Sequence, residues 1–77
     1  MKLLSNRQEQ IMSLLWEYGA LTVTQVQSKL KDKLHYNTIS TIIRGLETTG
    51  FINHKNEYKP YSYYVEITKE QYINSIQ

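Results

Sequence analysis

The stretch that decides the fold runs from residue 36 to residue 52 and reads YNTISTIIRGLETTGFI. Its apolar residues recur at steps of three and four, which is the spacing of a helix with one buried face: Ile39, Ile42, Ile43 and Leu46. Gly50 follows as a residue that can end a helix. The segment therefore predicts an amphipathic helix over residues 36–49.

The other side of this predicted helix is polar and built from short side chains: Asn37, Ser40, Thr41, Arg44 and Thr48. Asn, Ser and Thr are weaker helix formers than the Lys and Glu that a merely solvated face would use. In a major groove, Asn can pair with adenine, Arg can pair with guanine, and a Thr methyl can contact thymine. The composition favours a helix that reads DNA, and a plain polar face is the alternative.

Two shorter helices precede this segment. A Ser or Thr followed three residues later by Gln, the pair that caps a helix start, occurs at Ser5, Thr22 and Thr68. The first helix should stop at Gly19, with one apolar stripe: Ile11, Leu14, Leu15 and Tyr18. The second follows Thr22 and should be about ten residues long, with Val23, Val26 and Leu30 on one face. A connection of only a few residues around His35 then predicts a helix-turn-helix.

After Gly50 the pattern changes to the alternation of strands. Residues 51–55 and 61–67 are rich in aromatic and β-branched side chains, and the turn formers at 56–60 between them predict a β-hairpin. Residues 19–22 should lend a short third strand, because a lone hairpin is marginal in water. A last helical segment begins at Thr68, with Tyr72, Ile73 and Ile76 on one face.

This order predicts a mainly α fold with a small antiparallel β-hairpin, a winged helix-turn-helix. We expect residues 1–67 to form a winged-helix DNA-binding domain. Residues 68–77 should begin a C-terminal helix, which is either the start of a truncated dimerisation region or the end of a naturally short regulator.

The predicted hairpin carries a second set of basic groups. Lys55 and Lys59 flank the turn, where ammonium groups can contact phosphates and add salt-dependent affinity without sequence information. Alternatively, they are edge-strand lysines that discourage aggregation. The hairpin is also rich in tyrosine, and we expect these side chains to pack on the hairpin and helices rather than stack on bases: Tyr58, Tyr61, Tyr63 and Tyr64.

Composition excludes several functional classes. The chain has 77 residues, a formal net charge of +2 and no cysteine, so it has room for one small domain and for no disulfide or thiolate metal site. His35 and His54 are the only imidazoles, and they form no metal motif with the nearest carboxylates, Glu47 and Glu57. We expect no metal, no cofactor and no enzyme activity. With neither a signal peptide nor a membrane-length apolar stretch in the sequence, we expect a soluble, cytoplasmic protein without membrane contact.

Residues 36–52 resemble the recognition-helix signature of the penicillinase-repressor family, the BlaI/MecI/CopY type of winged-helix regulator. The resemblance extends back to QIMSLLW at residues 10–16, and forward through NHK at 53–55 and YSYY at 61–64. It covers nearly the whole chain, and its motifs are fairly specific. Gly45 departs from the family pattern, which commonly has a second basic residue at this position.

The resemblance implies a sequence-specific transcriptional repressor that occupies a double-stranded DNA operator as a homodimer, here through the C-terminal segment. The recognition helix 36–49 would enter the major groove, and the wing 54–61 would lie on phosphates. The implied contacts fall on matching positions: Asn37, Thr38, Ser40, Thr41 and Arg44, with Lys55 and Lys59 from the wing. Trp16 would be a core residue. The alternative is a winged-helix module that docks a protein and never touches DNA.

Overall fold

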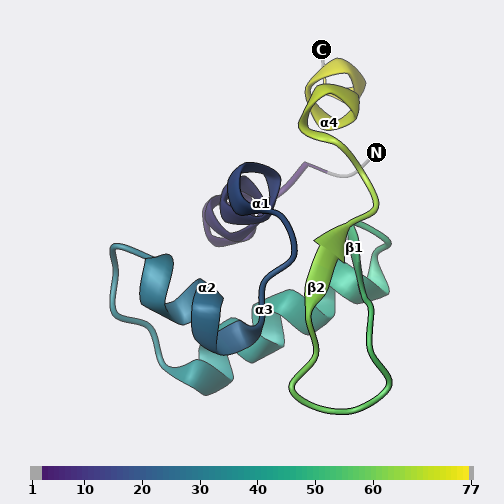
Figure 1. Ribbon diagram of the computed structural model, residues 1–77. Helices are drawn as coiled ribbons and strands as arrows, with labels where there is room; N and C mark the ends of the chain where they lie inside the picture. Colours follow the sequence, from purple (N-terminus) through teal and green to yellow (C-terminus); the bar gives the residue numbers. More distant parts are fainter. Residues whose placement is uncertain (1–2, 77) are drawn as a thin grey trace.

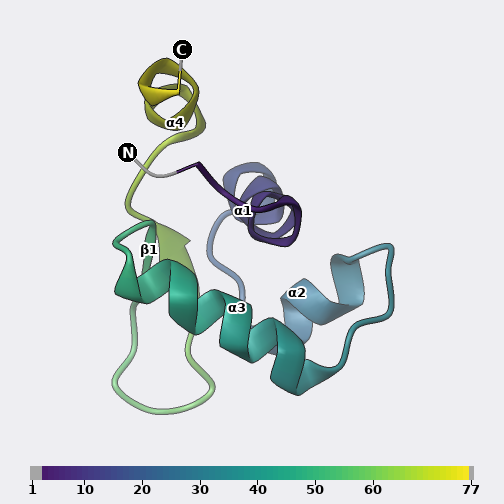
Figure 2. The same cartoon turned by 180° about the vertical axis from the view of Figure 1, so that it is seen from behind.

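The computed structural model describes residues 3–76 of the chain. Its elements follow the order α1 (Asn6–Tyr18), α2 (Val23–Lys29), α3 (Tyr36–Thr48), β1 (Ile52–His54), β2 (Tyr63–Val65) and α4 (Lys69–Ser75), as Figure 1 shows. The helix-turn-helix of α2 and α3 is followed by an antiparallel hairpin, so the predicted winged-helix fold is confirmed. In Figures 1 and 2, α4 lies at the opposite end of the molecule from the hairpin loop.

Three helices start where the sequence predicts. Ser5, Thr22 and Thr68 each accept a hydrogen bond from the backbone N–H three residues on, and the Gln at that position caps the backbone in return. The second helix is shorter than predicted, with seven residues instead of about ten. Leu30 already has extended backbone angles, and Gln27 donates from Nε2 to the Leu34 carbonyl at 3.0 Å, which holds the connecting turn.

The hairpin pairs Ile52 with Val65 and His54 with Tyr63. The third strand that we expected over residues 19–22 is a single bridge, in which Leu21 and Tyr63 exchange backbone hydrogen bonds of 3.0 and 2.8 Å. The reason is local, since Gly19 has a φ of 87° at the end of α1 and Thr22 already caps α2. Too little extended chain remains between them for a strand.

The core lies between the helices and the inner face of the hairpin. Its most deeply buried side chains are Ile11, Met12, Leu15, Val26, Ile39, Ile43, Leu46 and Ile52. Met12 was not expected here. Tyr18, which we predicted on the buried stripe of the first helix, is instead 54% exposed. It lies in the last turn of α1, and the Lys29 ammonium sits 4.2 Å above its ring.

Two aromatic side chains connect the C-terminal segment to the rest of the fold. Trp16 is half-buried rather than fully inside the core, and its Nε1 donates to the Ile67 carbonyl at 2.9 Å. The buried Tyr72 packs 5.9 Å from the Trp16 ring, and its hydroxyl accepts from the Leu4 N–H at 3.0 Å. The face predicted for the last helix is therefore only partly used, because Ile73 and Ile76 are 40% and 44% exposed.

Within residues 3–76, no helix has the length and apolar character needed to cross a membrane.

Candidate nucleic-acid interface

The polar side of α3 is not covered by the rest of the fold. Asn37, Thr38, Thr41 and Arg44 are exposed, and Ser40 is half-buried. Within the described part of the chain, four of these side chains make no hydrogen bond and no ion pair: Asn37, Thr38, Ser40 and Arg44. Their donors and acceptors are therefore available to an external partner.

The threonines on this helix use their hydroxyl groups internally. Thr41 donates from Oγ1 to the Asn37 carbonyl at 2.9 Å, and Thr48 donates to the Arg44 carbonyl at 2.9 Å. Such bonds to the carbonyl four residues earlier hold the hydroxyl on the helix backbone. Thr41 can thus offer an acceptor lone pair and its methyl group to a partner, but no hydroxyl proton.

A groove of about 550 Å³ separates the first turns of α3 from the hairpin loop. It brings together four of the residues predicted from sequence, Asn37, Ser40 and Arg44 from the helix and Lys59 from the loop. The other three predicted residues, Thr38, Thr41 and Lys55, do not line it. The helix face and the wing thus share one concave surface, flanked by further exposed residues.

Sequence reasoning missed four polar or aromatic side chains that line the same groove: Thr24, Tyr36, Tyr61 and Tyr63. Tyr36 could have been found, because Tyr36, Ser40 and Arg44 follow each other at four-residue spacing and so share one helix face. Thr24, Tyr61 and Tyr63 come from outside α3, and no local pattern indicates that they line this groove.

The hairpin loop is held in shape by one side chain. Asn56 donates from Nδ2 to the carbonyls of Tyr58 and Pro60 at 2.6 and 2.7 Å, and its Oδ1 accepts from the Ser62 N–H at 2.9 Å. Lys55 and Lys59 are exposed, and neither ammonium group has an ion-pair partner among residues 3–76. The loop therefore presents two positive charges without an ion-pair partner among the described residues, and Glu57 lies between them in the sequence.

The four hairpin tyrosines occupy different environments. Tyr63 is buried in the core, Tyr61 packs partly against it, Tyr64 is half-buried and Tyr58 is 80% exposed. Burial raises the pKa of the Tyr63 hydroxyl, and the negative charge of Glu47 adds to this rise. Most of this tyrosine cluster thus packs on the fold, as expected, while Tyr58 projects into solvent.

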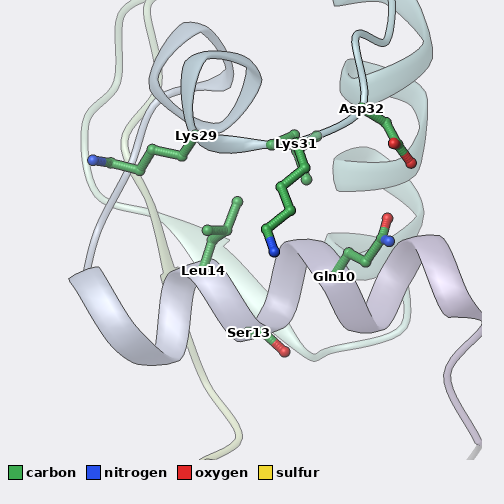
Figure 3. Close-up of a pocket in the computed structure, with 7 residues that line it drawn as sticks. Gln10, Ser13, Leu14, Lys29, Lys31 and Asp32 are labelled. Carbon is green, nitrogen blue, oxygen red and sulfur yellow. The ribbon is translucent and has the colours of Figure 1, made fainter.

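A second hollow of about 390 Å³ lies between α1 and the end of α2 (Figure 3). Figure 3 shows Leu14 pointing into it and the Lys31 ammonium reaching toward α1, whereas Lys29 points away. The one carboxylate at its edge, Asp32, accepts a hydrogen bond from Arg7 at 2.6 Å. None of the predicted site residues lines this hollow. Among the described residues, no group of three or more His, Cys, Asp and Glu side chains is placed to hold a metal ion.

Comparison with known proteins places the chain in a family. Bacillus licheniformis BlaI, whose solution structure was determined in its monomeric form in complex with the blaP half-operator, superposes with a TM-score of 0.75. The two sequences are 22% identical, and the match covers 92% of this chain and 89% of the BlaI chain, so the likeness shows a common fold. No curated protein gives a significant sequence match. Residues 4–77 match the profile of the penicillinase repressor, and the chain belongs to the penicillinase repressor family.

Proposed function

We propose that this chain is the sequence-specific, double-stranded DNA-binding part of a transcriptional repressor. In this proposal the recognition helix, residues 36–49, enters the major groove, and the wing, residues 54–61, lies on phosphates. The observation that carries the proposal is the groove in which the unpartnered Arg44 side chain and the wing residue Lys59 face a common space. A duplex presents base edges in its major groove and phosphates along its backbone, so one surface with both groups can contact the two together.

Each candidate residue has a role in this arrangement. Asn37 and Arg44 have the amide and guanidinium groups that pair bidentately with adenine and guanine, and Ser40 can bond to either kind of base. Thr38 and Thr41 lie outside the groove on the exposed part of the helix, where they can contact the neighbouring base pairs. Lys55 and Lys59 supply charge toward phosphates, which adds affinity at every sequence.

The related proteins also support a DNA-binding repressor. The family is one of repressors, and the BlaI domain of similar fold is bound to a half-operator in its solution structure. A single winged module buries only about 600 to 1,000 Å² on DNA, which favours pairing of two copies on one operator. We propose residues 1–67 as the DNA-binding domain and residues 68–77 as the start of a dimerisation helix, whose exposed Ile73 and Ile76 are available to a second copy.

The test begins with selection of duplexes from a random-sequence library by the purified chain. The selected duplex and a scrambled duplex are then titrated at two salt concentrations. We expect tighter binding to the selected sequence, and we expect the Arg44→Ala, Thr41→Ala double variant to lose most of that preference. Lys31→Ala is the matched control, because it removes a positive charge that does not line the groove. Equal affinity for both duplexes would contradict the proposal.

The second candidate function is a module that docks a protein partner. The exposed apolar side chains of α4 favour it. It predicts that replacing Ile73 impairs partner binding and that Lys55→Ala and Lys59→Ala leave binding insensitive to salt. Selection of a DNA sequence by the chain decides against it.

A further inference from the structure

A hydrogen bond joins the end of the recognition helix to the base of the wing. Glu47, in the last turn of α3, accepts a hydrogen bond from Nδ1 of His54 in β1, with Oε2 and Nδ1 2.5 Å apart. An ionised carboxylate has no proton to give, so Nδ1 of His54 must carry the proton in this contact. Both side chains are only about one-third exposed, at 28% and 35%. The contact is therefore better shielded from solvent than the Arg7 and Asp32 pair, whose side chains are 42% and 58% exposed.

The position of Glu47 is otherwise unfavourable. It is the only acidic residue in α3, and it lies near the C-terminal end of the helix, where the macrodipole favours positive charge. The hydrogen bond from His54 offsets part of this cost, which indicates that Glu47 has a role in joining two elements.

The imidazole of His54 continues the connection into the wing. Tyr61 stacks on it with ring centroids 4.3 Å apart and an angle of 27° between the planes. Tyr63, opposite His54 in the hairpin register, closes the cluster edge-on at 6.2 Å from each of these two rings. Tyr61 is only two residues from Lys59, and both line the groove. A continuous series of contacts thus runs from the end of α3 to Tyr61, two residues from the wing lysine.

We propose that Glu47, His54 and Tyr61 are positioning residues that hold the wing against α3, so that Lys59 and Arg44 meet DNA as one preorganised surface. This inference rests on the proposed function. Preorganisation matters because ordering a loop at the moment of binding subtracts from the affinity. Asn56 already holds the tip of the loop internally, and this cluster fixes the loop relative to the helix.

The experiment compares two substitutions of equal charge, Glu47→Ala and Glu47→Gln. Both remove the carboxylate charge, but the Gln amide oxygen can still accept from His54. The selected duplex is titrated from about 50 to about 200 mM salt, a range over which each phosphate contact changes affinity by about 3.5-fold. We expect Glu47→Gln to retain the wild-type salt dependence. Glu47→Ala should bind more weakly. Between these two salt concentrations, its affinity should also fall by a factor about 3.5 times smaller than the factor for the wild type, because the Lys59 phosphate contact is no longer held.

A double-variant cycle separates positioning from general destabilisation. If Glu47 acts through the wing lysine, adding Glu47→Ala to Lys59→Ala costs no further affinity. All titrations are made where thermal melting shows each variant folded, so a loss of stability does not change the salt slope. Identical affinity and salt dependence for Glu47→Ala and Glu47→Gln would overturn the inference, as would additive losses in the cycle.

A separate readout keeps this inference distinct from the proposed function. Ring-to-ring nuclear Overhauser contacts between His54 and Tyr61 in the DNA-free protein should persist in Glu47→Gln and weaken in Glu47→Ala. If the wild-type chain selects no duplex, the proposed function fails. If the ring contacts are unchanged in Glu47→Ala, the positioning role fails, whatever the outcome of the DNA selection.

Discussion

At the scale of single residues, the groups that α3 can offer to a partner are those that do not already form hydrogen bonds within the helix. The Thr41 hydroxyl is bonded to the Asn37 carbonyl, whereas the side chains of Asn37 and Arg44 make no hydrogen bond within residues 3–76. A polar residue on the helix surface therefore need not contact a base through its polar group. This distinction leads to a prediction for Thr41 that its residue type alone does not give.

We expect Thr41 to contribute to DNA binding through its methyl group. Thr41→Val keeps a methyl at that position and should bind the selected duplex nearly as well as wild type. Thr41→Ser keeps the hydroxyl and loses the methyl, which should cost about 0.8 kcal/mol, or about fourfold in affinity. Fluorescence anisotropy titrations measure both. Tighter binding by the Ser variant than by the Val variant would show that the hydroxyl is the reader.

Ionisation of Tyr63 makes the free energy of unfolding depend on pH in the alkaline range. Its pKa is raised above the ordinary value of 10.0, chiefly by burial, so the unfolded chain loses this proton at lower pH than the folded chain does. The stabilisation is therefore complete below pH 10 and is lost as the pH rises through the raised pKa. We expect Tyr63→Phe to weaken the fall in melting temperature above that pH. Tyr58→Phe, at a side chain that is 80% exposed, should leave the fall unchanged.

At the scale of elements, the sequence predicts most where the signal is local. Apolar spacing located α3, and the capping pairs located the starts of the other three helices. The errors come from competition between neighbours, as when Thr22 is needed to cap α2 and cannot extend a strand. The contact of Glu47 with His54 has no local signal, because it depends on how the hairpin folds back on α3.

Gly45 offers a direct test of α3 as an element. It lies within the helix, and a β-carbon added there would meet no atom within 4 Å. Gly45→Ala should therefore stabilise the protein by about 1 kcal/mol, which raises the melting temperature by about 4 to 8 °C. Gly50→Ala is the contrasting variant, because Gly50 has a φ of 88° that strains other residues. A lower melting temperature for Gly45→Ala would show that α3 is not the regular helix described above.

At the scale of the whole molecule, the fold separates two surfaces. The helix face and the wing share one groove, while α4 lies at the other end and is attached by Trp16 and Tyr72 (Figure 1). Composition and periodicity were enough to predict the first surface, because its residues belong to one helix and one turn. The groove itself was not predictable, since Thr24 reaches it from α2 and the place of Tyr61 depends on how the hairpin folds back on α3.

The central claim is that the exposed side of α3 enters the major groove of a duplex. The most direct measurement is the set of intermolecular nuclear Overhauser contacts between the chain and its selected duplex. We predict contacts from the side chains of Asn37, Thr41 and Arg44 to protons on the major-groove edges of bases. Contacts confined to α4 or to the hollow beside Lys31, with none from α3, would contradict the account.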